Sequence, residues 1–229
     1  QAGRWAMVSL CLCWSFAALG ADLKDETAKL SYTFGMDIGN SIKQQEQELD
    51  LELMFQAIRD VYEGRETQLT LEEATAVRQA YIQRRQQEAA AEREAAVTRN
   101  KTEGEAFLAK NAKAEGVKVT ESGLQYMIIN PGSSKKPLAT DRVTVHYSGK
   151  LLNGTEFDSS YSRGEPTTFP LNGVIPGWTE GLQLIGEGGK VKLFIPSELA
   201  YGDRGAGAAI GPNSTLIFEV ELISIDGAE

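Results

Sequence analysis

Residues 173–178 read Gly-Val-Ile-Pro-Gly-Trp and lie between two runs that both have the pattern of β-strands. A loop that left Val174, Ile175 and Trp178 in water would forfeit roughly 25 cal/mol per Å² of apolar area. That cost is avoided if the side chains face one another around a binding site. The stretch therefore predicts the lining of a pocket.

The composition of the chain is that of a soluble globular protein, with 229 residues of which 41% are hydrophobic and 24% charged. This length allows one long domain or two short ones. The formal net charge is -9, and no Lys/Arg cluster stands free of nearby acids. Because phosphate binding needs a basic patch, we expect no nucleic-acid partner.

Residues 1–20 have the pattern of a signal peptide. An apolar run at 7–19 follows Arg4, and Ala18-Leu-Gly20 offers the small residues that signal peptidase accepts. At about 13 residues, the run is too short to span a bilayer comfortably. We expect cleavage after Gly20, no stable membrane insertion afterwards, and a periplasmic, outer-membrane-associated or secreted protein of a Gram-negative bacterium.

Two alternatives for this segment remain open, a retained N-terminal anchor and a lipoprotein. Against the lipoprotein, Leu10 precedes Cys11 and Leu12 precedes Cys13, where a lipobox needs a small residue. Cleavage after Gly20 would remove both cysteines, so the mature chain would need no disulfide.

Residues 21–69 have the pattern of a helical domain. An apolar stripe at helical spacing runs through the first helix at Leu30, Phe34 and Ile38. Asp50 is a candidate N-cap for a second helix, which Gly64 would end. Gly35 and Gly39 either let another helix cross closely or mark a break, and the sequence favours neither.

A third, long helix is predicted at 70–115, because Thr70 and Glu73 form a capping box and no Pro or Gly follows until Gly104. Residues 84–99 hold no large apolar side chain before Val97, so we expect this part to be solvated on all sides and to connect rigidly, without an apolar face of its own. Two short helices cannot bury a core alone. We therefore expect a homodimer through residues 21–69; the alternative is a monomer whose helices fold back on the C-terminal half.

Beyond Gly116 the periodicity becomes that of strands, at 123–129, 142–152, 167–171, 190–195 and 215–225. In the second run Val143, Val145 and Tyr147 alternate with polar residues, as on a strand with one buried face. The only helical signal is short, at 178–185. The predicted fold is α+β, with an all-α N-terminal domain, a long connecting helix and an antiparallel sheet wrapped around one small helix.

Five motifs in this half resemble those of the FKBP-type peptidyl-prolyl cis-trans isomerases: Val-His-Tyr-Ser-Gly at 145–149, Asn-Gly-Thr-Glu-Phe-Asp-Ser-Ser at 153–160, Val-Ile-Pro-Gly-Trp at 174–178, Ile-Pro-Ser-Glu-Leu-Ala-Tyr-Gly at 195–202 and Leu-Ile-Phe-Glu-Val-Glu-Leu at 216–222. The layout of the helical half resembles the macrophage infectivity potentiator (Mip) group, dimers in which a long helix carries each isomerase domain. The resemblance implies an isomerase domain at 116–229, proline-containing polypeptides as substrates, macrolides as inhibitors and no cofactor or metal.

The resemblance also implies the site. The catalytic residues would be Asp158, Tyr201, Ile175, Trp178, Phe157 and Tyr147, and the substrate-binding residues Val174, Arg163, Phe169, Ile210 and Phe218. Trp178 would form the floor, while the Ile175 N–H and the Tyr201 hydroxyl would donate to substrate carbonyls. Asp158, held by Arg163, would be a polar wall and not a general base.

Three residues depart from the small cytosolic members of the family. Thr167 stands in place of an aromatic, and Ala206 and Ala209 stand in place of a His and an Ile. The loop over the pocket is therefore smaller and less apolar than in those members, so their substrate preference and macrolide affinity do not carry over to this chain. His146, the only histidine, alternates away from the Tyr147 face, so we expect a structural role for it and no Ser-His-Asp chemistry.

The sequence therefore favours an exported folding catalyst that desolvates and twists the X-Pro amide without covalent chemistry. A fragment starting near Gly116 is expected to fold as a monomer with full activity on short peptides. The rival function is a chaperone or adhesin that holds unfolded chains between the two arms of the dimer, with isomerisation incidental. Every pocket residue would serve both functions.

Overall fold

The computed structural model describes residues 23–44 and 48–226, so the predicted signal peptide lies outside the described residues. The chain divides into two compact units, residues 1–73 and 74–229. Among the described residues, no helix combines the length and the apolar character needed to cross a membrane.

The first unit contains α1 (Glu26–Gln44), α2 (Leu51–Tyr62) and the first turn of α3 (Leu71–Asn111). The predicted N-cap is confirmed, since the Asp50 carboxylate accepts from the N–H groups of Glu52 and Leu53 at 3.0 and 3.1 Å. Helix α1 continues through Gly35 and Gly39, so a break there is wrong. A Cβ at either glycine would meet no described atom within 4 Å.

Apolar side chains of this unit stay exposed. Within its described residues, α1 has no buried residue and α2 buries only Asp60. Phe34 and Phe55 are 60% and 52% exposed. A single copy of this unit therefore has no apolar core among the residues that the structure describes.

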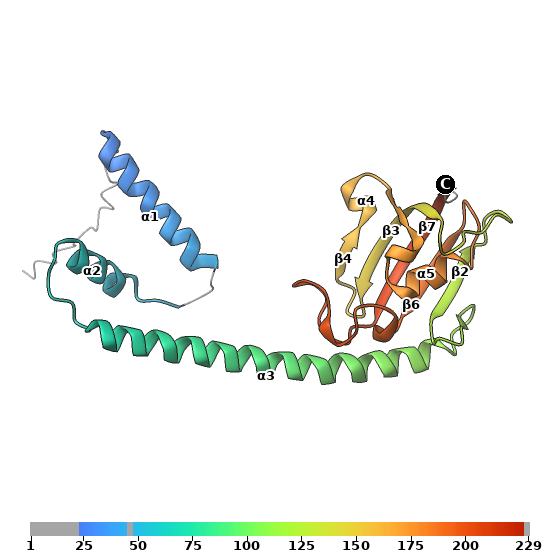
Figure 1. The fold of residues 1–229 in the computed structure, drawn as a ribbon, viewed down its shortest axis with the longest axis horizontal. Coiled ribbons are helices and arrows are strands. Elements are labelled where there is room, and N and C mark those ends of the chain that lie inside the picture. The colour runs from blue at the N-terminus through green and yellow to red at the C-terminus, as the bar shows by residue number, and fades with distance from the viewer. Residues whose placement is uncertain (1–22, 45–47, 227–229) are drawn as a thin grey trace, which may run out of the picture. The chain divides into compact units, whose positions relative to one another are not determined.

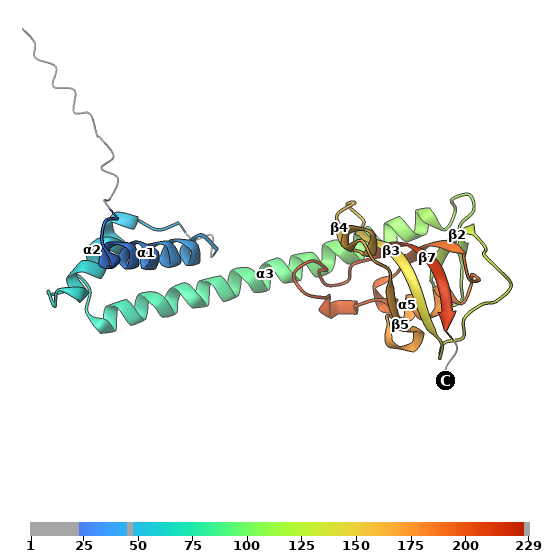
Figure 2. The ribbon, with the colours of Figure 1, turned by 90° about the horizontal axis from the view of Figure 1, so that it is seen from above.

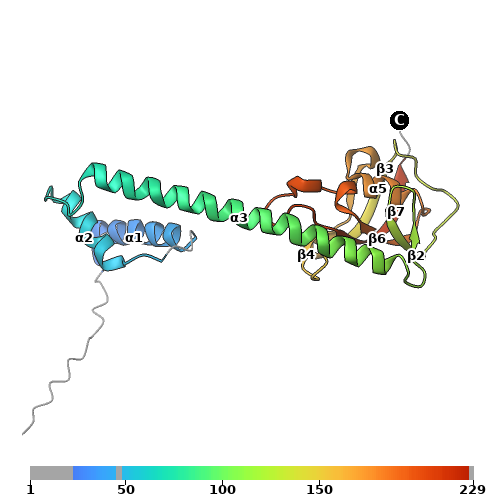
Figure 3. The same cartoon turned by 90° about the horizontal axis from the view of Figure 1, so that it is seen from below.

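Helix α3 begins at the predicted capping box, in which the Glu73 N–H donates to Thr70 Oγ1 at 3.2 Å and the Thr70 N–H donates to Glu73 Oε2 at 2.8 Å. Residues 82–95 are exposed, as expected, but Ala96 and Val97 are half-buried. Phe107 packs on Phe194 with the ring centroids 5.9 Å apart. The expectation of a helix without an apolar face is therefore wrong for its last third, which lies alongside the sheet of its own unit in both Figure 2 and Figure 3.

The second unit is built on an antiparallel sheet in the order β1-β2-β6-β7-β3-β4, with β5 paired to β3, seven strands among the described residues (Figure 1). The strands are β1 (Lys118–Val119), β2 (Gln125–Asn130), β3 (Arg142–Leu151), β4 (Glu156–Ser159), β5 (Thr167–Pro170), β6 (Lys190–Ile195) and β7 (Leu216–Asp226). All five predicted strands are present. The two that the sequence did not reveal, β1 and β4, are short and lie at the ends of the sheet path.

Short helices complete the unit: α4 (Ser160–Arg163), η1 (Leu171–Gly173), α5 (Pro176–Leu182), η2 (Ser197–Leu199) and η3 (Gly202–Arg204). The predicted alternation along β3 is confirmed, with Val143, Val145 and Tyr147 buried. Helix α5 packs closely on β6, because a Cβ at Gly177 or Gly181 would lie 2.5 Å from Ile195 or 2.6 Å from Leu193. These glycines bring α5 against the sheet.

Candidate functional site

A pocket of about 740 Å³ opens between α5, the sheet and the loop before β7. Its volume lies within the usual range of small-ligand sites. All the predicted site residues except Arg163 line it, namely Tyr147, Phe157, Asp158, Phe169, Val174, Ile175, Trp178, Tyr201, Ile210 and Phe218. Side chains from six separate segments thus converge on one cavity.

Trp178 forms the floor of this pocket. This residue is 5% exposed, and the rings of Tyr147 and Phe218 each stand edge-on to the indole at 5.0 Å and 84°. Phe157 is edge-on to Phe218 at 5.5 Å. Edge-to-face pairs contribute about 0.5–1.5 kcal/mol each beyond area burial. The aromatic box is therefore held in shape without a ligand.

Gly149 makes this packing possible. A Cβ there would lie 2.5 Å from the Phe218 ring and 2.8 Å from the Phe157 ring. Because no side chain stands there, both rings can approach the backbone of β3 closely. The requirement for glycine is thus one of space.

A polar wall faces the aromatic floor. The Tyr147 hydroxyl donates to Asp158 Oδ2 at 2.5 Å and accepts from Arg163 Nη2 at 2.9 Å. Arg163 Nη1 also pairs with Asp158 Oδ1, so the three side chains close a ring. Arg163 lies outside the pocket lining and acts on it through Asp158 and Tyr147.

This ring keeps Asp158 ionised at neutral pH. Partial burial works to raise the pKa of Asp158, but the hydrogen bonds from Tyr147 and Arg163 prevail and hold that pKa below its ordinary 3.8. Burial and the bond to Asp158 raise the pKa of Tyr147. A carboxylate with a lowered pKa is a poor general base. The wall therefore presents a fixed dipole to the pocket.

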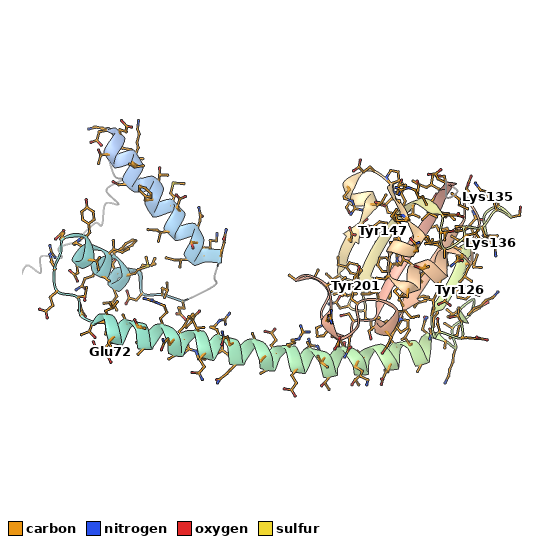
Figure 4. The ribbon with its side chains drawn as sticks, in the orientation of Figure 1. Glu72, Tyr126, Lys135, Lys136, Tyr147 and Tyr201 are labelled. Carbon is orange, nitrogen blue, oxygen red and sulfur yellow. The ribbon has the colours of Figure 1, made fainter. Side chains whose placement is uncertain are left out.

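Two donors at the rim have no acceptor among the described residues, the Ile175 N–H and the Tyr201 hydroxyl. Ile175 is the N-cap of α5, a position where backbone N–H groups lack a partner in the helix. Tyr201 is 41% exposed and lies in the turn before η3 (Figure 4). Both are free to bind a ligand carbonyl.

The family models match both parts of the chain. Residues 133–223 match the model described as "FKBP-type peptidyl-prolyl cis-trans isomerase", and residues 27–128 match "Domain amino terminal to FKBP-type peptidyl-prolyl isomerase". A "Probable FKBP-type peptidyl-prolyl cis-trans isomerase FkpA" of Neisseria meningitidis serogroup B is 49% identical over 202 residues, 87% of this chain and 74% of that protein. The chain belongs to the FKBP-type peptidyl-prolyl cis-trans isomerases.

Other relatives agree with this assignment. The "Outer membrane protein MIP" of Legionella longbeachae is 40% identical over 97% of this chain and 96% of its own length. The crystal structure of FkpA from Escherichia coli matches with a TM-score of 0.68 at 41% identity, covering 90% of this chain and 99% of that one. The predicted family, α+β fold and enzyme class are confirmed, and the rival binding function is not favoured.

His146 lies outside the pocket lining of this isomerase. Its ring stacks on Tyr161 at 4.7 Å, and Nδ1 lies 2.9 Å from Ser160 Oγ. Among the described residues, no cluster of three His, Cys, Asp or Glu side chains could hold a metal ion. The contacts of His146 are with neighbouring side chains outside the pocket, in agreement with the structural role expected from the sequence.

Five further residues border the pocket. Gly173 belongs to the stretch predicted as its lining, and Thr167, Ala206 and Ala209 are the positions at which the chain departs from the small cytosolic members. Only Gly207 was not singled out from the sequence. The Thr167 hydroxyl accepts from Arg163 Nη2 at 3.2 Å, so this threonine also supports the polar wall. Ala206 and Ala209 bring only small side chains to the loop side of the lining.

Proposed function

We propose that the pocket lowers the barrier to X-Pro rotation by desolvation and orientation, without a covalent step. That barrier is roughly 18–20 kcal/mol because amide resonance must be broken. The supporting observation is an aromatic box of about 740 Å³ with an ionised carboxylate on one wall and two free donors on its rim. The planar amide is the more polar form, so an apolar site favours the twisted one.

Each polar group has a proposed role in this mechanism. The proline ring lies on Trp178, while the Ile175 N–H and the Tyr201 hydroxyl bind substrate carbonyls on either side of the bond. The Asp158 carboxylate, fixed by Arg163, faces the carbonyl carbon as the amide loses its resonance. Only interactions that strengthen in the twisted state accelerate the reaction.

The test is kinetic. Tyr201→Phe should lower kcat/KM on a tetrapeptide several-fold without unfolding the domain, because it removes one donor worth about 0.5–1.5 kcal/mol. Phe and Tyr have nearly the same shape, so the packing is kept. Full activity in this variant and in Asp158→Asn would show that the polar half of the mechanism is wrong.

The structure also supports a homodimer formed by α1 and α2. Their apolar side chains are exposed in a single copy, including Phe34 at 60% and Leu53 at 57%. The matching faces of a second copy would bury this area with two-fold symmetry. Sedimentation equilibrium should give twice the chain mass at micromolar concentration, whereas a monomer would contradict the proposal.

We place this enzyme beyond the inner membrane, acting on proline-containing polypeptides during their folding. The proposal rests on the signal-like pattern of residues 1–20 and on relatives named FkpA and "Outer membrane protein MIP". Macrolides are proposed inhibitors, and their binding should be weakened by the small side chains of Ala206 and Ala209 in the lining. Mass spectrometry of the mature N-terminus should find Ala21, and a chain from the native host that still carries residues 1–20 would refute export by cleavage.

A further inference from the structure

One wall of the pocket is a loop that lies outside the sheet, residues 200–215. It contributes Tyr201, Ala206, Gly207, Ala209 and Ile210 to the lining. The loop is closed on itself by the paired backbone bonds of Ala206 and Ile210, at 2.8 and 3.1 Å. Ile210 is 7% exposed and Ala206 packs against the core, whereas the tip between them holds only Gly207, Ala208 and Ala209.

Helix α3 holds the loop from outside on both sides of the tip. Arg93 Nη2 donates to the Asp203 carbonyl at 2.9 Å, before the tip. Asn100 Nδ2 donates to the Pro212 carbonyl at 2.8 Å and lies 3.4 Å from Ser214 Oγ, after the tip. The acceptors at 203 and 212 are backbone carbonyls, so these bonds fix the path of the chain.

Gly104 sets how closely the helix approaches. It is the one buried residue of α3, and a Cβ there would lie 2.4 Å from Thr215 Oγ1. Glycine is disfavoured inside a helix, and this close approach accounts for its presence. Asn100, Gly104 and Phe107 follow one another at i, i+4 and i+7, so they share one face of α3. The helix therefore presents a single surface to the loop and to Phe194.

We propose that Arg93 and Asn100 are positioning residues of the isomerase pocket, through which α3 sets the place of the 200–215 wall and with it the selectivity for the residue before proline. Neither side chain lines the pocket, so neither touches the substrate. They act through the backbone that carries Tyr201 and Ile210. This inference rests on the proposed role of the pocket.

The first test uses the full chain with Asn100→Ala and Arg93→Ala, beside Lys101→Ala as an exposed control on the same helix. The kcat and KM values are measured by exchange NMR on two tetrapeptides, with Leu or Ala before proline. We expect kcat/KM for the Leu peptide to fall about three- to tenfold in both variants, mostly through KM, as loss of a net hydrogen bond implies. The Leu-to-Ala preference should shrink, and Lys101→Ala should match wild type.

Hydrogen exchange separates positioning from a general loss of stability. Amides of residues 203–211 should exchange faster in Asn100→Ala, while those of β3 and β7 keep their wild-type protection. Unchanged selectivity in both variants, or equal acceleration throughout the sheet, would overturn the proposal. If Tyr201→Phe is also fully active, the pocket assignment has failed, whereas loss in Tyr201→Phe alone refutes only the role of α3.

A compensating pair gives a second, independent test. Gly104→Ala should displace the helix from Thr215 and reproduce the loss of selectivity. Adding Thr215→Ala removes the clashing Oγ1 and should restore the preference in the double variant. The close contact between Gly104 and Thr215 would have no role if Gly104→Ala kept wild-type selectivity. The same would follow if the selectivity of the double variant did not recover to that of Thr215→Ala alone.

Discussion

The two units use the same kinds of apolar side chain in opposite ways. In the sheet unit Leu216, Val220 and Leu222 have no exposed area, and Phe218 is 4% exposed. In the helical unit Phe34 is 60% exposed. A sheet covered by one short helix closes its own core, whereas two short helices do not. The sheet unit is therefore complete as one chain, whereas the helical unit needs a partner surface.

Helix α3 combines an exposed part with a part that packs on the sheet. Residues 82–95 are exposed, whereas Phe107 packs on Phe194 and Gly104 lies against Thr215. The strand periodicity begins beyond Gly116, but packing of the sheet unit extends back into the helix. A fragment starting near Gly116 would lack these contacts, so we expect it to be less stable than one that keeps the end of α3.

The largest expected effect is the loss of stability when the end of α3 is removed, which a comparison of two fragments measures. A fragment of residues 116–229 loses the partners of the buried Gln125, which donates to the Leu108 carbonyl and accepts from Asn111, both at 2.9 Å. It also exposes Phe194. We expect its free energy of unfolding to be about 3–5 kcal/mol below that of a 90–229 fragment. Urea denaturation of the two fragments measures this, and equal midpoints would show that α3 is dispensable.

Next in size is the effect of charge on the exposed face of α1. Phe34→Glu with Ile38→Glu should weaken dimerisation at least about a hundredfold, because two charges per copy would be buried in the interface. Peptide kcat/KM should stay at the wild-type value, since the pocket lies wholly in the other unit. Lys43→Glu, at an exposed position of the same helix, is the control. An intact dimer would place the interface elsewhere.

The polar wall predicts a pH profile. The folded-state pKa of Asp158 lies below 3.8. Its ionisation therefore adds stability that is present above the unfolded pKa and is lost as pH falls through the folded value. The kcat/KM of wild type should be flat from about pH 8 to pH 5. Asp158→Asn should be several-fold less active over this whole range. A wild-type rate that falls between pH 7 and 5 would mean a raised pKa and a general-base role.

The smallest expected effect concerns His146. His146→Ala removes the stacking on Tyr161 and the bond to Ser160, and should lower the free energy of unfolding by about 1 kcal/mol. Tetrapeptide kcat/KM should change less than twofold, because His146 is not in the pocket lining. A much larger loss of activity at unchanged stability would give this residue a role in the reaction.

The sequence was informative wherever one local pattern dictated the structure. Asp50, the Thr70 capping box and the alternation along β3 each depend on near neighbours in the chain. The strands β1 and β4 were not predicted; two and four residues carry little periodicity, although β5, which is as short as β4, was predicted. The contact of α3 with the sheet unit joins residues far apart in sequence, and its one local sign was Gly104 inside a long helix.

The pocket was predictable for a different reason. Its aromatic residues resemble an established family, and the structure brings them together around Trp178. The same resemblance was silent on Arg93 and Asn100, because side chains that act on a backbone carbonyl leave no motif. The seven-residue spacing of Arg93 and Asn100 places them on one face of α3, but only the structure shows which loop that face contacts.

The most direct test of the account is exchange NMR of the cis and trans forms of a short X-Pro peptide with the 90–229 fragment and the full chain at equal site concentration. If the sheet unit with the end of α3 is a complete isomerase, the two kcat/KM values should agree within about twofold, and Tyr201→Phe should lower both several-fold. An inactive fragment beside an active full chain, or a fragment indifferent to Tyr201→Phe, would contradict it.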